Sequence, residues 1–201
     1  LNISFIFRAC YDKANRTSIS SFRGPVLSKG LEILKEVKAS LDLPVLSDVH
    51  NVNDIKEAGK VLDILQIPAF LSRQTDLLVA AAATGRTINL KKGQFISGEA
   101  IGFAVDKIRN SGNNNVMLTE RGSMFGYQDM IVDFRNIPVM KENDVPVVLD
   151  ITHSVQQPNT SSGVSGGMPE MIETIAKAVI AVGEAGIVID THPEPSNALS
   201  D

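Results

Sequence analysis

The chain has 201 residues, a formal net charge of -4, 43% hydrophobic residues and 21% charged residues. This composition is typical of a folded globular protein and excludes a disordered chain. No apolar run reaches the roughly 18 residues of a membrane span, and the acidic balance argues against a nucleic-acid partner. The single cysteine, Cys10, has no partner for an internal disulfide, which favours the reducing cytoplasm. We expect it to be a small buried residue.

Short apolar runs rich in β-branched residues alternate with longer amphipathic stretches along the whole chain. The runs are almost entirely apolar, which is the pattern of strands buried on both faces of a parallel sheet. We therefore predict strands at 3–7, 44–49, 61–67, 87–90, 115–118, 146–151 and 186–189.

The stretches between these runs carry apolar residues every three to four positions, which predicts helices with one buried face. The predicted helices are 27–40, 53–60, 76–84 and 169–185. Gly85 and Gly186 are expected to be left-handed caps after helices, and Thr75 or Asp76 is expected to cap a helix at its start. The Ser- and Gly-rich segment 159–167 is expected to be a loop.

This alternation fits either an open doubly wound sheet or an eight-stranded barrel. No glycine-rich fingerprint follows the first strand, and polar residues end nearly every strand, which favours a barrel. We predict one α/β domain over residues 1–201, a (β/α)8 TIM barrel. Such a barrel needs eight strands and about 250 residues, so its first strand and closing helix are expected to be missing here. The strand-end residues are Arg8, Asp48, His50, Gln66, Asn89, Lys91, Lys92, Glu120, Arg121, Asp150, His153, Asp190 and His192.

Several of these positions carry groups that bind anions or metals. Segment 12–18 holds two cations, an amide and two hydroxyls, which suits a phosphorylated sugar, although a solvated charged loop is the alternative. Lys91 and Arg121 are placed to bracket a phosphate or carboxylate. His153 with nearby carboxylates resembles a divalent metal site, although a hydrogen-bonded histidine without metal is the alternative.

Many motifs, in order from about Phe5 to Asp201, resemble the 3-deoxy-D-manno-octulosonate 8-phosphate synthase family, also named 2-dehydro-3-deoxyphosphooctonate aldolase. This family implies a (β/α)8 barrel, usually a homotetramer in the cytoplasm. It implies an enzyme, a transferase that condenses phosphoenolpyruvate with arabinose 5-phosphate for lipopolysaccharide synthesis. The motifs are Asp12–Ser18, Phe22–Pro25, Ser47–His50, Gln66–Phe70, Arg73–Asp76, Lys91–Phe95, Glu120–Gly122, Phe125–Tyr127, Asp150–Ser154 and His192–Pro195.

The resemblance also implies roles for individual residues. Phosphoenolpyruvate is assigned Arg8, Lys13, Lys91 and Arg121, with Gln66, Pro68 and Ala69 nearby. The sugar phosphate is assigned Asn15, Arg16, Thr17 and Ser18, with Arg73 reaching its phosphate from a neighbouring subunit. The catalytic residues are Lys13, Lys91, His153 and Asp201. In metal-dependent members His153, Asp190 and Asp201 are ligands of a divalent ion (Mn, Zn, Fe or Co), and the fourth ligand, on the first strand, sets the metal class.

Three positions depart from the family pattern. Arg8 replaces the usual Lys, Asp190 replaces the usual Glu, and Val26 replaces a Gly, so a positive φ at Val26 would strain the backbone. Two alternatives stay open. One is the sister synthase that uses erythrose 4-phosphate, in which the sugar-binding segment is one residue shorter than Lys13–Arg16. The other is a barrel that binds phosphosugars without turnover.

Overall fold

The computed structural model describes residues 3–16, 18–126, 129–158, 166–183 and 185–195. The chain divides into two compact units. The first comprises Leu1–Leu90 and Phe103–Val116, and the second comprises Lys91–Gly102 and Met117–Asp201. Among the described residues, no helix has both the length and the apolar character that a membrane span requires.

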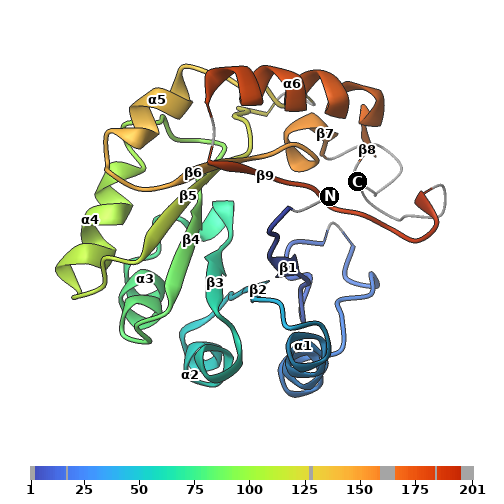
Figure 1. Cartoon of the computed structure of the whole chain (residues 1–201), viewed down its shortest axis with the longest axis vertical. Coiled ribbons are helices and arrows are strands. Elements are labelled where there is room, and N and C mark those ends of the chain that lie inside the picture. The colour runs from blue at the N-terminus through green and yellow to red at the C-terminus, as the bar shows by residue number, and fades with distance from the viewer. Residues whose placement is uncertain (1–2, 17, 127–128, 159–165, 184, 196–201) are drawn as a thin grey trace. The chain divides into compact units, whose positions relative to one another are not determined.

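Strands and helices alternate in the first unit, and its strands pair in parallel in chain order, β1-β2-β3-β4 (Figure 1). The register places Gln66 opposite both Asp48 and Asn89, so three strand-end polar residues share one row. The elements are β1 (Phe7–Arg8), α1 (Leu27–Leu41), β2 (Val45–Asp48), α2 (Val52–Val61), β3 (Ile64–Ile67), the 3-10 turn η1 (Ala69–Leu71), α3 (Thr75–Ala82), β4 (Thr87–Lys91) and α4 (Gly102–Asn110).

The second unit repeats this arrangement with parallel strands in the order β5-β6-β9. Two short strands, β7 and β8, form a separate antiparallel pair. The elements are β5 (Val116–Glu120), α5 (Asn136–Lys141), β6 (Val147–Asp150), η2 (His153–Val155), β7 (Gln156–Gln157), β8 (Gly166–Gly167), η3 (Pro169–Met171), α6 (Ile172–Val182) and β9 (Gly186–Val188).

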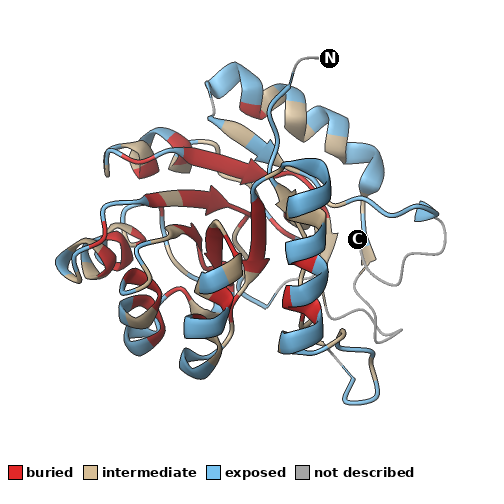
Figure 2. Ribbon diagram, turned by 60° about the horizontal axis from the view of Figure 1, so that its bottom comes forward, coloured by how far each residue is buried: buried red, intermediate tan, exposed pale blue. Residues whose placement is uncertain are grey.

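Strands β2 to β6 form most of the buried core, β1 and β9 are partly exposed, and the helices leave their outer sides exposed (Figure 2). Leu65 on β3, Leu118 on β5 and Leu149 on β6 are fully buried. Because the strand order does not reverse within either unit, the arrangement is that of a β/α barrel rather than of a doubly wound sheet. The predicted fold class is confirmed.

Several predicted boundaries were wrong. The first strand is only Phe7–Arg8, and residues 3–6 are exposed without strand pairing. The strand predicted at 61–67 begins at Ile64, because Val61 belongs to the last turn of α2. Of the loop predicted at 159–167, residues 159–165 lie outside the described residues and the last two form β8.

The predicted helix caps were partly wrong. Gly85 does follow α3 with φ 68°, but the left-handed residue after α6 is Gly183, with φ 85°, and Gly186 opens β9 instead. The N-cap of α3 is Gln74, which makes no side-chain capping bond. The Thr75 hydroxyl instead accepts a hydrogen bond from Lys107 Nζ at 2.8 Å.

Val26 adopts the positive φ at which the sequence predicts strain. Its φ is 65° and its ψ is 167° at the start of α1, a region that essentially only glycine occupies without cost. Its side chain is exposed, so it gains little from burial in return.

Replacing Val26 with Gly is therefore expected to raise the free energy of unfolding by about 1 kcal/mol, because it removes the strain of a β-branched residue at positive φ. Urea unfolding of the wild type, Val26→Gly and Val26→Ala tests this. The alanine variant is the control, since it keeps a Cβ and much of the strain. A glycine variant no more stable than the wild type would contradict the strained backbone.

Candidate functional site

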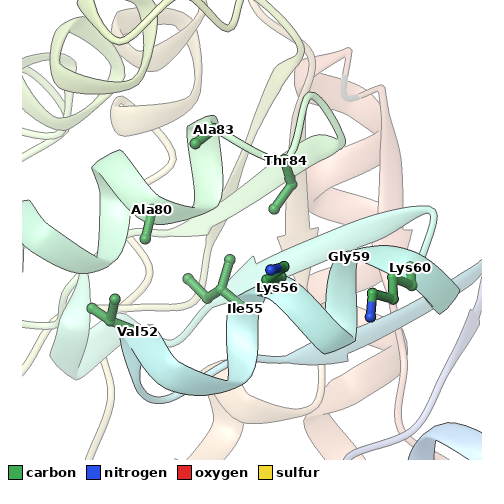
Figure 3. A pocket seen from close by; sticks show the side chains of 8 residues that line it. All are labelled: Val52, Ile55, Lys56, Gly59, Lys60, Ala80, Ala83 and Thr84. Atoms are coloured by element: carbon green, nitrogen blue, oxygen red, sulfur yellow. The ribbon is translucent and has the colours of Figure 1, made fainter.

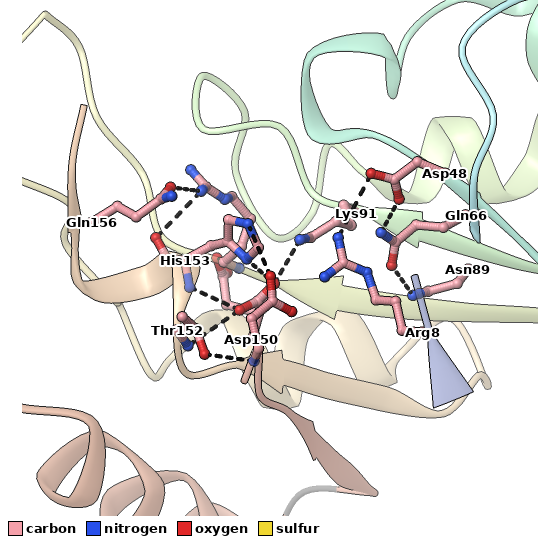
Figure 4. Close-up of polar contacts among 12 residues, drawn as sticks. Arg8, Asp48, Gln66, Asn89, Lys91, Asp150, Thr152, His153 and Gln156 are labelled. Atoms are coloured by element: carbon pink, nitrogen blue, oxygen red, sulfur yellow. Dashed lines mark hydrogen bonds and ion pairs between the residues drawn. The ribbon is translucent and has the colours of Figure 1, made fainter. Parts of the chain in front are cut away.

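The described residues with a catalytic or ligand role in the resemblance lie at the carboxyl ends of parallel strands or in the loops that follow. In the second unit, buried Asp150 ends β6 and contacts two of them. Lys91 Nζ donates to Asp150 Oδ2 at 2.6 Å, and His153 Nδ1 lies 2.8 Å from the same oxygen (Figure 4). The backbone N–H groups of Thr152 and His153 donate to the other oxygen, Oδ1, at 3.2 and 2.9 Å. One carboxylate therefore orients both a lysine and a histidine.

The charge on Asp150 is stabilised by its neighbours. Burial alone would raise the pKa of its carboxyl, but the charges of Lys91 and His153 and the hydrogen bonds they donate hold that pKa well below its ordinary value. Asp150 is therefore ionised near neutral pH and is the counter-ion of Lys91, whose side chain is only 6% exposed.

Arg121, directly after β5, contacts the same turn that holds His153. Its Nη2 donates to Gln156 Oε1 at 2.9 Å and to the backbone oxygen of His153 at 3.3 Å. Its Nη1 lies 3.6 Å from Met130 Sδ. Lys91 is linked to this turn through Asp150, so both cations that the sequence pairs are connected to the turn that holds His153.

His153 also faces a second carboxylate. Its Nε2 lies 3.7 Å from Asp190 Oδ2, and Thr152 Oγ1 accepts the backbone N–H of Asp190 at 2.9 Å. The ring nitrogen Nε2 of His153 and the carboxylate of Asp190 are ligand types that fit a transition metal. A metal-binding histidine usually has its other ring nitrogen held by a carboxylate, as Asp150 holds Nδ1 here. Asp201, the third predicted ligand, lies outside the described residues. Among the described residues no group of three or more His, Cys, Asp or Glu side chains is gathered as a metal site.

A second polar network runs across the strand ends of the first unit. Arg8 forms an ion pair with Asp48 at 3.7 Å, Gln66 donates to Asp48 Oδ1, and Asn89 donates to Gln66 Oε1 at 2.8 Å (Figure 4). Gln66 is fully buried, so its amide is oriented by these two partners. The sequence assigned ligand contacts to Arg8 and Gln66 but no role to Asp48 and Asn89, which the structure shows to be their partners.

Cys10 is a member of this network rather than a simple packing residue. It is only partly buried, and its Sγ lies 3.6 Å from Asp48 Oδ2. Burial, followed by the nearby charge of Asp48, raises the pKa of its thiol, so it is not an activated nucleophile. The sequence predicted a small buried residue, and the structure shows a partly buried thiol that takes part in a polar network.

A bidentate ion pair between Arg23 and Asp12 joins the two ends of the loop after β1. Arg23 Nε donates to Asp12 Oδ1 at 2.9 Å and its Nη2 donates to Oδ2, while the backbone N–H of Lys13 donates to the Arg23 carbonyl at 2.6 Å. Gly24 lies so close to this loop that a Cβ there would be 2.5 Å from the backbone oxygen of Tyr11. Arg16 is half-buried, Asn15 and Ser18 are exposed, and Thr17 lies outside the described residues.

The remaining predicted ligands surround the turn after β3. Pro68 and Ala69 are buried at the start of η1, directly beyond Gln66. Arg73 is exposed after η1, and its backbone oxygen accepts a hydrogen bond from Lys107 Nζ at 3.4 Å. Its side chain is thus at the surface of the first unit.

One groove lies apart from these strand-end residues. It has a volume of ≈ 450 Å³ between α2 and α3 and includes Val52, Ile55 and Thr84 in its lining (Figure 3). None of the predicted site residues lines it. It is therefore not the candidate active site.

A parallel β/α fold with polar and charged residues at the carboxyl ends of its strands defines the class: a barrel-type enzyme. The comparisons with known proteins then give the family. The DAHP synthetase I family matches residues 1–201, and the chain belongs to it.

Curated relatives cover this chain completely. A protein of Desulfotalea psychrophila is 52% identical over 201 residues, which are 100% of this chain and 72% of the relative. Proteins of Pelobacter propionicus and Koribacter versatilis are 53% and 51% identical, again over 100% of this chain and over 74% and 73% of their own lengths. All three are named 2-dehydro-3-deoxyphosphooctonate aldolase. The resemblance found in the sequence is thereby confirmed, and the chain is an enzyme.

Replacing Asp150 with Asn should leave the buried Lys91 ammonium without a counter-ion and lower the free energy of unfolding by about 3 kcal/mol. Combining it with Lys91→Met should recover much of that loss, because no buried charge then lacks a partner. Urea unfolding measures both. Glu32→Gln, which breaks the exposed ion pair with Lys29, is the control and should change stability by less than about 0.5 kcal/mol. An equally small loss for Asp150→Asn would refute the role of Asp150 as counter-ion.

Proposed function

We propose that this enzyme condenses phosphoenolpyruvate with D-arabinose 5-phosphate to give 3-deoxy-D-manno-octulosonate 8-phosphate and inorganic phosphate. The observation that carries the proposal is the pair of buried cations, Lys91 at the end of β4 and Arg121 directly after β5. Arg121 contacts the turn that holds His153, and Lys91 is linked to that turn through Asp150. Desolvated cations bind phosphate and carboxylate more strongly than solvated ones. The names of the curated relatives support the choice of this reaction.

In the proposed reaction C3 of phosphoenolpyruvate attacks the aldehyde carbon of the sugar, and the aldehyde oxygen takes up a proton. Water adds at C2, and the C2–O bond to phosphate then breaks to leave the ketone and inorganic phosphate. We assign Lys91 to protonate the aldehyde oxygen, because Asp150 holds its Nζ in one direction. His153, fixed by the same carboxylate, is assigned to orient the water.

The other predicted residues bind the two substrates. Arg8 and Lys13 are assigned with Arg121 to phosphoenolpyruvate, and Gln66 contributes an amide whose direction is set by Asp48 and Asn89. Both substrates are anions, so cations in contact with them would offset the repulsion between them. The segment Asn15–Ser18 is assigned to the sugar phosphate. The reaction belongs to lipopolysaccharide synthesis, and we place the enzyme in the cytoplasm.

The proposal includes a homotetramer in which Arg73 reaches the sugar phosphate of a neighbouring subunit. Arg73 is exposed on the first unit, so a second copy of the chain has access to it. Light scattering that gives the mass of a monomer would contradict this part of the proposal.

The second candidate is the sister synthase that uses erythrose 4-phosphate. It stays a candidate because the matched family is named after DAHP synthetase rather than after the octulosonate synthase. The segment Lys13–Arg16 favours the longer sugar, since it carries an additional amide at Asn15. A third candidate is a phosphosugar-binding protein without turnover, which the departures at Arg8, Val26 and Asp190 motivate.

We expect phosphate release from phosphoenolpyruvate to be faster with arabinose 5-phosphate than with erythrose 4-phosphate. Arg16→Ala should raise the KM for the sugar phosphate at least about ten-fold, because a charged contact to substrate is lost. Arg135→Ala is the control, because this exposed arginine pairs with Asp133 and touches no proposed ligand residue. Equal or faster turnover with erythrose 4-phosphate would favour the sister synthase, and no turnover with either would favour the binding protein.

We further propose that His153 and Asp190 are ligands of a divalent metal such as Mn, Zn, Fe or Co, with Asp201 as a third ligand. When bound, such an ion would supply Lewis-acid chemistry and order a water. The role of Asp150 is to hold the His153 ring so that Nε2 faces Asp190.

Calorimetric titration with Mn²⁺ of the metal-stripped protein should show binding that Asp190→Asn weakens by at least about ten-fold, since a charged ligand is replaced by a neutral one. Asp133→Asn, which changes a carboxylate that is 35% exposed on the same unit, is the control and should bind Mn²⁺ as the wild type does. Equal Mn²⁺ affinity in Asp190→Asn and the wild type would exclude Asp190 as a ligand.

A further inference from the structure

A second buried ion pair adjoins the two substrate-binding cations in the sequence, and the proposed reaction uses neither of its charges. Lys92 follows Lys91, and Glu120 precedes Arg121. Both side chains of this pair are 0% exposed, and Lys92 Nζ lies 3.5 Å from Glu120 Oε1. Burial lowers the pKa of Lys92, and the charge of Glu120 offsets part of that effect.

The Lys92 ammonium ties two loops together. Its Nζ donates to the backbone oxygens of Gly93 and Ile96 and to Ser123 Oγ, each at 3.1 Å. Its backbone N–H donates to the Thr119 oxygen at 2.8 Å. The segment after β4 is thereby fixed to the turn after β5.

The Glu120 carboxylate holds the backbone of that turn. Its Oε1 accepts the N–H groups of Arg121 and Gly122 at 2.8 and 2.7 Å, and its Oε2 accepts Asn136 Nδ2 at 3.0 Å. Gly122 has φ 90°, and a Cβ there would lie 3.2 Å from Met130 Cβ. The direction in which the Arg121 side chain leaves the backbone is therefore set by this carboxylate.

Neighbouring residues on extended backbone point to opposite sides. Accordingly, Lys91 contacts Asp150 whereas Lys92 contacts Glu120. A buried ion pair is a poor source of stability, because desolvation offsets most of its attraction. Its value here is geometric: a charge-assisted network with defined donors and acceptors permits only one arrangement of the two turns.

We propose that Lys92 and Glu120 are positioning residues whose ion pair and hydrogen bonds fix Lys91 and Arg121 for binding phosphoenolpyruvate. This inference rests on the proposed function, which assigns Lys91 and Arg121 to that substrate. Neither Lys92 nor Glu120 needs to touch the substrate, since each is fully buried and acts through the backbone of its neighbour.

The test compares the wild type with Lys92→Met, Glu120→Gln and the double variant. Calorimetry gives the Kd for phosphoenolpyruvate, thermal unfolding gives the Tm, and the phosphate-release assay gives the KM for arabinose 5-phosphate. Each single variant leaves one buried charge unpaired, so its Tm should fall and its Kd for phosphoenolpyruvate should rise at least about ten-fold. The double variant should recover most of the Tm but keep the raised Kd.

Asp63→Asn is the matched control. Asp63 also pairs with a lysine, Lys38, at 2.5 Å, and it also accepts a backbone N–H, that of Val45. It differs in position, because it lies at the amino ends of β2 and β3, whereas the proposed substrate-binding residues lie at the carboxyl ends of strands. This variant should lower the Tm and leave the Kd for phosphoenolpyruvate unchanged.

A double variant that recovers its Tm and binds phosphoenolpyruvate as the wild type does would overturn the inference, even if the single variants fail to fold. A rise in KM for arabinose 5-phosphate equal to the rise in Kd for phosphoenolpyruvate would also overturn it, because a general structural defect affects both substrates. A wild type that binds phosphoenolpyruvate without turnover would refute the proposed function alone. A wild type that does not bind phosphoenolpyruvate would refute both.

Discussion

The cost of burying charge governs this molecule. Parallel strands covered by helices create an apolar interior, and a substrate site for anions requires cations at the edge of that interior. Each such cation needs a negatively charged partner that offsets the cost of burial and keeps the cation in its protonated form. Asp150 meets this requirement for Lys91, and Glu120 meets it for Lys92. The Arg8 side chain, 14% exposed, is held by Asp48 in the same way.

These partners give the site its direction as well as its charge. Asp150 accepts two side chains and two backbone N–H groups, so neither Lys91 nor His153 has freedom to rotate. In the first unit, the parallel register places Gln66 between Asp48 and Asn89, and the amide is oriented by strand pairing itself. A preorganised site of this kind loses little entropy when it binds a charged substrate.

The sequence was sufficient for the fold class because buried parallel strands are apolar throughout and their ends are polar. It also placed Lys91, Arg121 and His153 at or just after strand ends, where the structure has them, while their roles in binding and catalysis stay predictions. It named no helix at α4 or α5, and it placed the start of β3 three residues early because Val61 is apolar in either a helix or a strand. The supporting roles of Asp48 and Asn89 depend on the register between neighbouring strands, and that of Asp150 depends on its contact with Lys91, 59 residues away in the chain. A single sequence shows neither.

Phosphoenolpyruvate is proposed to bind at the strand ends of the second unit, on Lys91 and Arg121. The most direct measurement is a crystal structure of the protein with phosphoenolpyruvate bound. We expect an anionic group of the substrate within hydrogen-bond distance of Lys91 Nζ and the Arg121 guanidinium, with Asp150 still in contact with the lysine. Phosphoenolpyruvate bound elsewhere, for example in the groove between α2 and α3, with Lys91 and Arg121 free of ligand, would contradict it.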